Sequence, residues 1–332
     1  MQRSRSHPRA AQSGLDDSPV GAAKKAVPLK RAGTARVGIS GWTYPPWRGE
    51  FYPRGLPQTR ELAYASRIFS TIEINGSFYS LQRPESWAHW AAETPDEFVF
   101  AIKGGRFITH MRRLRDAETP LANFCASGML RLGAKLGPLL WQLPPNFRFD
   151  AERIAGFLQL LPHDTDQAGA LARRHDARLA GRAWINPILP MPLRHAMEIR
   201  NDSFKTPEFI ALLRRHRVAL VAADTVEWPL LGDLTADFVY CRLHGSEELY
   251  ASGYDDAALD RWAARVRAWT RGGEPDDLPR IGGAAAERRG RDVFVYFDND
   301  AKVRAPFDAQ ALMRRLAGTA AAVETASRGE SP

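Results

Sequence analysis

The chain has 332 residues, of which 44% are hydrophobic and 25% are charged, a composition typical of a globular protein with a full core. This excludes a globally disordered chain and a fibrous protein. No apolar run approaches the roughly 18 residues that a membrane span needs, and the basic N-terminus lacks the apolar run of a signal peptide. We therefore expect a cytoplasmic protein without a membrane partner.

The net charge of +8 is concentrated at the N-terminus, because residues 1–36 carry eight Lys/Arg and two Asp, while the rest of the chain carries only +2. This segment is rich in Ser, Ala, Pro and Gly and has no hydrophobic periodicity. We expect residues 1–35 to form a disordered basic tail. Such a tail can touch nucleic acid nonspecifically, although most tails of this kind only aid solubility.

After the tail, short apolar runs alternate with helical patterns, as is typical of parallel βα units. The expected strands are 37–42, 71–75, 98–103, 138–143, 196–200, 218–224, 238–244 and 293–298. The expected helices lie near 59–69, 84–93, 120–136, 150–161, 206–216, 256–271 and 307–317, and a turn at 226–231 replaces the helix after the sixth strand. Eight such strands close most naturally into a TIM barrel, so we expect one α/β domain over 36–318 and a disordered C-terminal tail over 319–332.

Two segments depart from a minimal barrel. Residues 165–193 add a helical segment and a Pro-rich link before the fifth strand. Residues 272–291 are rich in Gly, Arg, Glu and Pro, and we expect them to form a mobile surface loop.

Several chemistries lack their sequence motifs. The chain has no phosphate-binding P-loop, no Gly-x-Gly-x-x-Gly before a helix and no Gly-x-Ser-x-Gly elbow. Cys125 and Cys241 lie far apart with no Cys-x-x-Cys motif, which argues against zinc, an iron–sulfur cluster and a disulfide framework. We expect both cysteines to be buried packing residues.

Polar residues recur at the carboxyl ends of strands that should otherwise be apolar, because both faces of a barrel strand are buried. Within a strand they share one parity, whereas neighbours such as Ile72, Ile199 and Cys241 suit the helix-facing side. We therefore expect the polar set to point into the barrel at its C-terminal mouth, where the active sites of this fold lie. The set consists of Ser40, Glu73, Asn75, Lys103, Gln142, Glu198, Arg200, Asp224, Arg242, His244 and Asp298.

Four of these residues are the candidates for catalysis. Glu73, Glu198 and His244 are suited to general acid/base catalysis, and Lys103 is suited to electrophilic stabilisation or nucleophilic attack. The alternative is structural: Glu73 and Lys103, which end adjacent strands, form a buried ion pair. Arg200 either neutralises Glu73 or clamps a substrate anion.

The remaining residues of the set are expected to bind the substrate. Arg200 and Arg242 hold negative charge in this interpretation, and Asn75, Gln142 and Asp224 orient the bound compound. Aromatic residues after the first two strands either stack on a sugar or base or form a hydrophobic lid over the barrel. These aromatic residues are Trp42, Tyr44, Trp47, Phe51, Tyr52, Phe78 and Tyr79.

A divalent metal site is an alternative use of the same mouth. Its oxygen and nitrogen ligands would come from Glu73, Glu198, Asp224, His244, Asp298 and His110. The cations Lys103, Arg200 and Arg242 would repel such an ion. We therefore predict no cofactor, with a divalent metal as the alternative.

A series of ordered motifs resembles a known family. The motifs are Gly38-Ile-Ser-Gly-Trp42, Glu73-Ile-Asn75, Phe78-Tyr79, Lys103 with Thr109-His110, Trp141-Gln142-Leu-Pro-Pro145, Glu198-Ile-Arg200, Arg242-Leu-His244-Gly245 with Tyr254, and Tyr296-Phe-Asp298-Asn299. From about Arg36 to Leu316 they are similar to the domain of unknown function 72 family, also called YecE-like. The resemblance implies a TIM barrel of unassigned activity, and Asp298 departs from it because the family more often has asparagine there.

The resemblance also completes the set of residues expected to bind substrate. That set is Trp42, Asn75, Tyr79, His110, Gln142, Arg200, Asp224, Arg242, Tyr254, Asp298 and Asn299. The main hypothesis is an enzyme, of hydrolase, lyase or isomerase type, that acts on a small anionic or polyhydroxylated substrate by acid/base chemistry. The alternatives are a nucleic-acid-binding or nucleic-acid-processing barrel, similar in fold to the endonuclease-four type and gripping a strand with its basic tail, and a binding barrel without chemistry.

Overall fold

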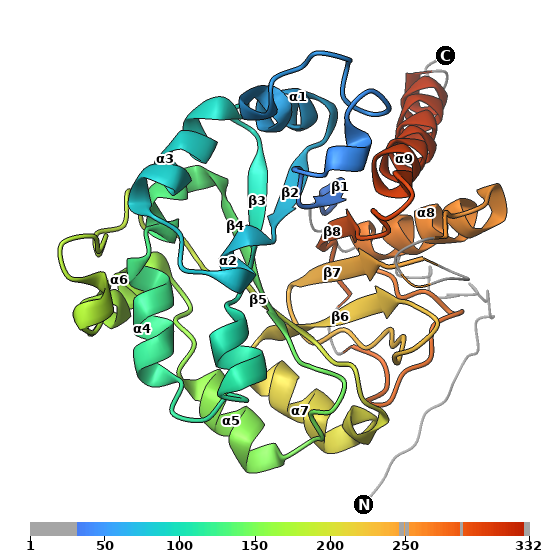
Figure 1. Ribbon diagram of the computed structural model, residues 1–332. Helices are drawn as coiled ribbons and strands as arrows, with labels where there is room; N and C mark the ends of the chain where they lie inside the picture. Colours follow the sequence, from blue (N-terminus) through green and yellow to red (C-terminus); the bar gives the residue numbers. More distant parts are fainter. Residues whose placement is uncertain (1–31, 246–248, 250–251, 286–287, 329–332) are drawn as a thin grey trace, which may run out of the picture.

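Eight parallel strands pair in chain order, and the last pairs with the first, so that the sheet closes into a barrel (Figure 1). The computed structural model describes residues 32–245, 249, 252–285 and 288–328. The strands are β1 (Ala35–Ser40), β2 (Thr71–Ile74), β3 (Val99–Lys103), β4 (Leu136–Gln142), β5 (His195–Glu198), β6 (Val218–Asp224), β7 (Phe238–Leu243) and β8 (Asp292–Phe297). The expected TIM barrel is confirmed, and each strand begins and ends within two residues of its expected bounds.

Helices surround the barrel on its outside (Figure 1). They are α1 (Glu61–Ile68), α2 (Gly76–Tyr79), α3 (Pro84–Glu93), α4 (Glu118–Ala126), α5 (Ala151–Gln159), α6 (Thr165–Ala172), α7 (Pro207–Arg215), α8 (Asp256–Thr270) and α9 (Arg304–Arg328). The segment after β6 has no helix, as its turn-like sequence indicates.

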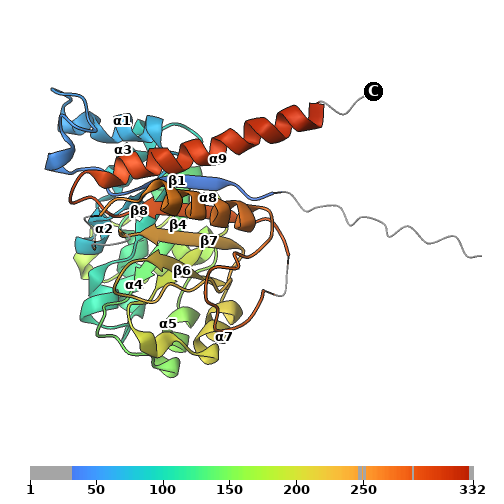
Figure 2. The same cartoon turned by 90° about the vertical axis from the view of Figure 1, so that its right-hand side faces the viewer.

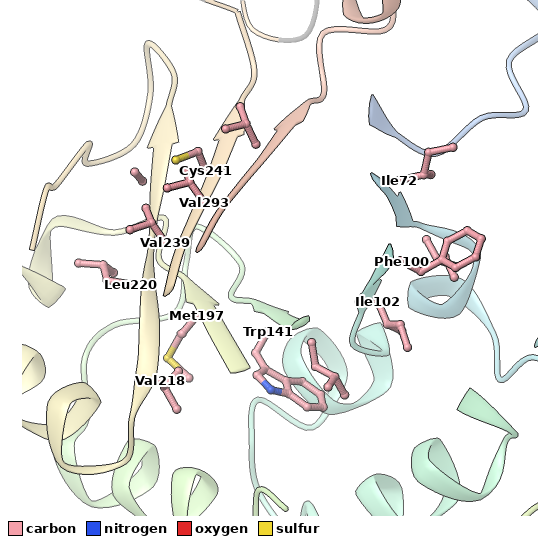
Figure 3. Close-up of a cluster of buried hydrophobic side chains, with 14 of the residues drawn as sticks. Ile72, Phe100, Ile102, Trp141, Met197, Val218, Leu220, Val239, Cys241 and Val293 are labelled. Atoms are coloured by element: carbon pink, nitrogen blue, oxygen red, sulfur yellow. The ribbon is translucent and has the colours of Figure 1, made fainter. Parts of the chain in front are cut away.

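Alternate residues of each strand face the helices and the barrel interior. In β3, Phe100 and Ile102 join the large cluster between strands and helices, whereas Ala101 joins a second cluster inside the barrel. Ile72, Ile199 and Cys241 also belong to the outer cluster, which confirms the helix-facing side expected for them, and Figure 3 shows part of this layer. Lys103 shares the parity of Ala101 and therefore points into the barrel.

The expected helix over 120–136 is wrong in its length. Helix α4 ends at Ala126, and Gly128 has a φ of 110°, a conformation that strongly favours glycine. A Cβ at this position would lie 2.6 Å from the Cα of Pro84, so the close approach of α3 also requires glycine. Residues 129–135 continue as a separate, tighter helical segment.

The disordered C-terminal tail expected over 319–332 needs correction. Helix α9 runs to Arg328, well past residue 317, and its C-terminal part projects beyond the barrel (Figure 2). Residues 319–323 are Thr-Ala-Ala-Ala-Val, and alanine is the strongest helix former, so an established helix propagates through them at little cost. Residues 329–332 lie outside the described part of the chain.

Two other segments connect closely to the barrel. Residues 272–285 and 288–291 contain no helix or strand, but Leu278 is buried and Asp233 accepts hydrogen bonds from the N–H groups of Ile281 and Gly282. At the N-terminus, the N–H of Gly33 bonds to Thr270, just before β1 begins. The tail expected over 1–35 otherwise falls on residues 1–31, outside the described residues.

Cys125 and Cys241 are buried free thiols, in agreement with the packing role expected for them. Burial raises the pKa of Cys125 to about 12, so this thiol stays protonated at neutral pH. Among the described residues, no helix combines the length and the apolar character that crossing a membrane requires. The cytoplasmic location stays a prediction.

Candidate functional site

Arg242 lies at the centre of the barrel and joins three carboxylates from three other strands or strand ends. Its guanidinium donates to Glu73 through Nη2 at 2.8 Å and through Nε at 3.1 Å. It also donates to Glu198 and to Asp298, at 2.8 Å in each case. These side chains meet because the strand parity that points Arg242 inward also holds for Glu73, Glu198 and Asp298.

Glu198 gathers a second ring of partners. Its Oε1 accepts from Arg200 Nε at 2.7 Å and from the Gln142 amide at 3.2 Å, and His244 Nε2 lies 3.8 Å away. His244 Nδ1 in turn lies 3.0 Å from Asp298 Oδ2. Burial alone would raise the pKa of Glu198, but Arg200 and Arg242 hold it well below its ordinary value. Glu198 is therefore a permanent anion at neutral pH.

We call Arg242, Glu73, Glu198, Asp298 and His244 the Arg242 cluster. The side chains of Arg242, Glu73, Glu198 and His244 have no solvent exposure at all. Their sequence positions predicted that they would meet at the carboxyl ends of the strands, and they do. Neither of the ion pairs that the sequence left open as alternatives is present, because Glu73 pairs with Arg242 rather than with Lys103, and Arg200 pairs with Glu198 rather than with Glu73.

Above the Arg242 cluster, a cavity of about 610 Å³ opens among the loops that follow β1, β2 and β8. We call it the mouth cavity. Five residues expected at the site line it: Trp42, Asn75, Tyr79, Lys103 and Asp298. Tyr44, Trp90 and Asp300 line it as well. Glu73, Glu198 and His244 do not line it. The Arg242 cluster therefore lies beneath the cavity and reaches it through Asp298.

Lys103 and Asp300 are the titratable side chains of the mouth cavity with pKa values closest to neutrality. Burial, followed by the charge of Arg242, lowers the pKa of Lys103 to about 8. Burial and the nearby charge of Asp298 raise the pKa of Asp300 to about 6. No ion pair joins Lys103 to a carboxylate within the described residues, and its Nζ lies 4.7 Å from the centre of the Phe78 ring.

Sequence reasoning missed Asp300. It is two residues beyond the end of the expected last strand, in a loop, where strand parity gives no orientation. A usable signal was present, since the carboxylates Asp298 and Asp300 are spaced by two residues directly after a barrel strand. Like charges at that spacing, partly removed from water, raise one of the two pKa values.

His110 and Arg200 lie near Lys103 at the mouth. The ring of His110 contacts Phe78 edge to face, and burial together with Arg200 and Lys103 lowers the pKa of His110 to about 4. His110 is therefore neutral at pH 7. The guanidinium of Arg200 lies 3.7 Å from the centre of the Trp228 ring, and this contact fixes it at the rim.

Three expected substrate-binding residues lie elsewhere. Asp224 faces the helices, where it accepts a hydrogen bond from Trp262 of α8 at 2.7 Å. It shares the parity of Leu220 and Ala222 in β6, whereas Ala219, Val221 and Ala223 fill the interior, so its assignment to the inward set was wrong.

Tyr254 and Asn299 lie in the connections that follow β7 and β8, outside the mouth cavity. The hydroxyl of Tyr254 accepts from the N–H of Gly245 at 3.2 Å. The amide of Asn299 donates to Asp308 of α9 at 2.8 Å. Both residues hold the β7–α8 and β8–α9 connections in place rather than line the mouth cavity.

The aromatic residues after β1 and β2 divide between the two expected roles. Trp47, Phe51 and Tyr52 are buried and pack against one another, as a hydrophobic cover would. Trp42 and Tyr79 line the mouth cavity, and the side chain of Tyr79 is largely exposed. As for the metal alternative, the described residues contain no group of three or more His, Cys, Asp and Glu side chains arranged to hold an ion.

The chain matches one family model and is similar in part to two bacterial proteins. A family model described as "Protein of unknown function DUF72" matches residues 36–331. The UPF0759 protein YecE of Escherichia coli (strain K12) is 30% identical over 111 residues, which are 33% of this chain and 38% of the relative. The UPF0759 protein YunF of Bacillus subtilis (strain 168) is 29% identical over 156 residues, 46% of this chain and 52% of the relative. The matches thus span about two fifths to one half of these relatives.

Solved structures share the fold over nearly the whole chain. A DUF72 family protein from Thermotoga maritima MSB8 has a TM-score of 0.64 at 21% identity and covers 85% of this chain and 99% of its own. A DUF72 family protein from Enterococcus faecalis V583 has a TM-score of 0.58 at 17% identity, with 86% and 98% covered. At these identities the likeness shows the barrel fold.

Proposed function

The chain belongs to the DUF72 family, which is described as being of unknown function, and we propose that it is an enzyme that performs acid/base chemistry on a small anionic or polyhydroxylated compound in the mouth cavity. The observation that carries this proposal is that Lys103 and Asp300 both line the mouth cavity, above the Arg242 cluster. One ammonium and one carboxyl thus face the same space.

The two groups are matched for proton transfer near neutral pH. The pKa of Lys103 is lowered to about 8 and that of Asp300 is raised to about 6, so each titrates close to the working pH of an enzyme. General acid/base catalysis is most effective when the pKa lies near that pH. Side chains in a cavity with pKa values shifted by burial and by nearby charges are typical of functional sites.

The lining of the cavity suits the proposed substrate class. Lys103 supplies positive charge for an anionic group, and Arg200, which lies outside the lining, joins burial and Lys103 in lowering the pKa of His110 at the rim. Asn75 donates to Ser40 at 3.0 Å through its Nδ2, and its Oδ1 lacks a hydrogen-bond partner among the described residues. Trp42 and Tyr79 offer ring surfaces of the kind that pack on the apolar faces of sugars. The cavity volume lies within the range of small-molecule sites.

In this proposal the Arg242 cluster positions the catalytic groups. Glu73, Glu198 and His244 are enclosed and committed to Arg242 or to each other, so proton transfer is assigned to Lys103 and Asp300 instead. The charges of the cluster also act on both groups. After burial, Arg242 is the next cause that lowers the pKa of Lys103, and Asp298 is the next cause that raises the pKa of Asp300.

The proposal is tested with the full chain and a small-molecule extract of bacterial cells. Mass spectrometry should find a compound that the wild-type protein consumes and that Lys103→Met and Asp300→Asn leave intact. Arg314→Gln, which removes a charge from the exposed face of α9, is the matched control and should behave as wild type. Consumption that persists in both cavity variants, or no consumption by the wild type, would overturn the proposal.

A further inference from the structure

A second cavity lies at the opposite end of the barrel, where the strands begin. Its volume is about 770 Å³, and its apolar floor includes Val99, Leu136 and Phe294. Figure 2 shows β1 entering the barrel from this end. We call it the basal cavity. None of the residues that line the mouth cavity lines this one.

Among the described residues, the lining of the basal cavity holds more basic than acidic side chains. Two described carboxylates line it, those of Asp237 and Asp292. Six guanidinium groups face them: those of Arg36, Arg194, Arg214, Arg217, Arg289 and Arg291. Such a concentration of like charge destabilises a fold by self-repulsion unless an anion balances it.

Both carboxylates are already engaged by one arginine. Arg194 lies 2.8 Å from Asp292 and 3.5 Å from Asp237. Burial alone would raise the pKa of Asp292, but hydrogen bonds from the Thr34 N–H and Arg194 lower it, so this carboxylate stays charged and bound. Its charge therefore balances Arg194, while Arg36, Arg214 and Arg217 bring further positive charge to the same lining.

Arg36 and Arg214 donate hydrogen bonds to uncharged backbone carbonyl oxygens. Arg36 donates to the carbonyl of Glu97 at 3.1 Å. Arg214 donates to the carbonyl oxygens of Leu234, Gly282 and Gly283 at 3.2, 2.7 and 2.9 Å. Carbonyl oxygens fix the position of a guanidinium but do not neutralise it. Both groups are thus preorganised positive charges on the cavity wall.

Arg217 completes the wall from the end of α7. It precedes β6 with a φ of 53°, so the backbone here makes a tight left-handed turn. Burial and then the charge of Arg217 lower the pKa of His163, another lining residue. His163 is therefore neutral at pH 7 and adds hydrogen-bonding capacity without adding repulsion.

We propose that the basal cavity binds a small polyphosphate, either inorganic or carried by a nucleotide. Guanidinium groups bind phosphate oxygens in bidentate fashion, and several of them here converge on one concave space. The volume lies within the range of small-molecule sites, and a chain of phosphate groups offers more oxygens to these guanidinium groups than a single phosphate does. Phe294 in the lining is buried among the residues of the barrel interior, so recognition falls on the phosphate chain rather than on a base.

Titration calorimetry of the full chain with inorganic tripolyphosphate, ATP and inorganic phosphate tests the proposal. We expect tripolyphosphate and ATP to bind with similar affinity and inorganic phosphate to bind far more weakly. Arg36→Gln and Arg217→Asn should each weaken tripolyphosphate binding about tenfold or more, the value of one charge-assisted hydrogen bond. Asparagine suits Arg217 because it tolerates a positive φ, so this variant keeps the fold.

Arg314→Gln is the matched control, since it removes the same charge from the exposed face of α9. Binding that weakens equally in Arg314→Gln would show diffuse attraction to a basic protein and overturn the proposal. Absence of tripolyphosphate binding would also overturn it. So would an oligonucleotide that binds more tightly than tripolyphosphate and depends on Arg36 and Arg217, because it would identify a nucleic-acid site.

A second measurement uses the wild-type chain alone. Phenylglyoxal modifies arginine side chains, and peptide mapping reports the rate at each position. Tripolyphosphate should protect Arg217 and Arg194 and leave the rate at Arg314 unchanged. Equal rates at Arg217 with and without tripolyphosphate would contradict the proposal, even if calorimetry detected binding elsewhere on the chain.

Discussion

Arg242 binds Glu73 through two parallel hydrogen bonds, Nη2 to Oε1 at 2.8 Å and Nε to Oε2 at 3.1 Å. The two residues belong to β7 and β2, which are not neighbours in the barrel, so the pair spans its interior. Tyr240, one layer below, repeats the link by donating to Glu73 at 2.6 Å. The barrel is thus held across its interior as well as around its circumference.

Replacement of Arg242 by Met should therefore lower the free energy of unfolding by about 3 to 5 kcal/mol or more, because Glu73, Glu198 and Asp298 would remain buried without their shared cation. Urea unfolding at pH 7 measures the loss. Arg200→Met is the matched control, since Arg200 forms one ion pair among the described residues, with Glu198 at the rim. An equal loss in both variants would contradict the central position of Arg242.

Replacement of Lys103 by Met should stabilise the protein at pH 7, on the order of 2 kcal/mol after allowance for its partial exposure. The pKa of Lys103 is lowered from 10.5 to about 8, so between these values the unfolded chain binds a proton that the folded chain does not. Wild-type stability should rise with pH across that window, and the advantage of Lys103→Met should shrink there.

Unfolding by urea at pH 7, 8, 9 and 10 tests this difference. Lys205→Met is the control, because Lys205 pairs with Asp202 in an exposed position where substitutions cost little. A constant difference between Lys103→Met and wild type from pH 7 to 10 would mean that Lys103 titrates normally.

Replacement of Asp300 by Asn should have the opposite pH signature. The pKa of Asp300 is raised from 3.8 to about 6, so the folded state binds the extra proton between these values and wild-type stability falls as pH rises through them. Asp300→Asn should match wild type near pH 4 and exceed it above pH 6, on the order of 2 kcal/mol. Thermal melts at pH 4, 5, 6 and 7 measure the gap, and a gap that does not open would refute the assignment.

Replacement of Gly128 by Ala should destabilise the protein by several kcal/mol, because the new Cβ would meet the Pro84 backbone at 2.6 Å and the φ of 110° strains any side chain. Gly156→Ala is the control. Gly156 lies within α5 with no atom in the way of a Cβ, so alanine there should add about 0.5 to 1 kcal/mol. Thermal melts that moved in the same direction for both variants would contradict this account.

The fold and much of the site followed from alternation in the sequence. Odd- and even-numbered residues of a strand face opposite sides of the sheet. This alternation predicted that Glu73, Lys103, Glu198 and Arg242 point into the barrel. It failed for Asp224 because the inward residues of β6 are the odd-numbered ones, and the position of Asp224 at the strand end concealed this. Pairing across the barrel, such as Arg242 with Glu73, depends on the diameter of the closed sheet, which no local pattern specifies.

Asp300 could not be oriented from the sequence for a different reason. It lies in a loop after β8, and its place in the mouth cavity depends on how that loop packs against the segment after β1, where Trp47 donates to the carbonyl of Asp300 at 3.4 Å. The basal cavity was also invisible, since its arginines come from segments far apart in the chain and share no periodicity.

The Arg242 cluster also affects how the chain can fold during synthesis. Glu73 and Glu198 are made long before Arg242, and Asp298 comes from the last strand end. A nascent chain that ended before β7 would have to enclose two carboxylates without the cation that they share. The ribosome must therefore release nearly the whole barrel before Glu73 gains the arginine that binds it, which favours late, all-or-none closure over stepwise assembly of strands.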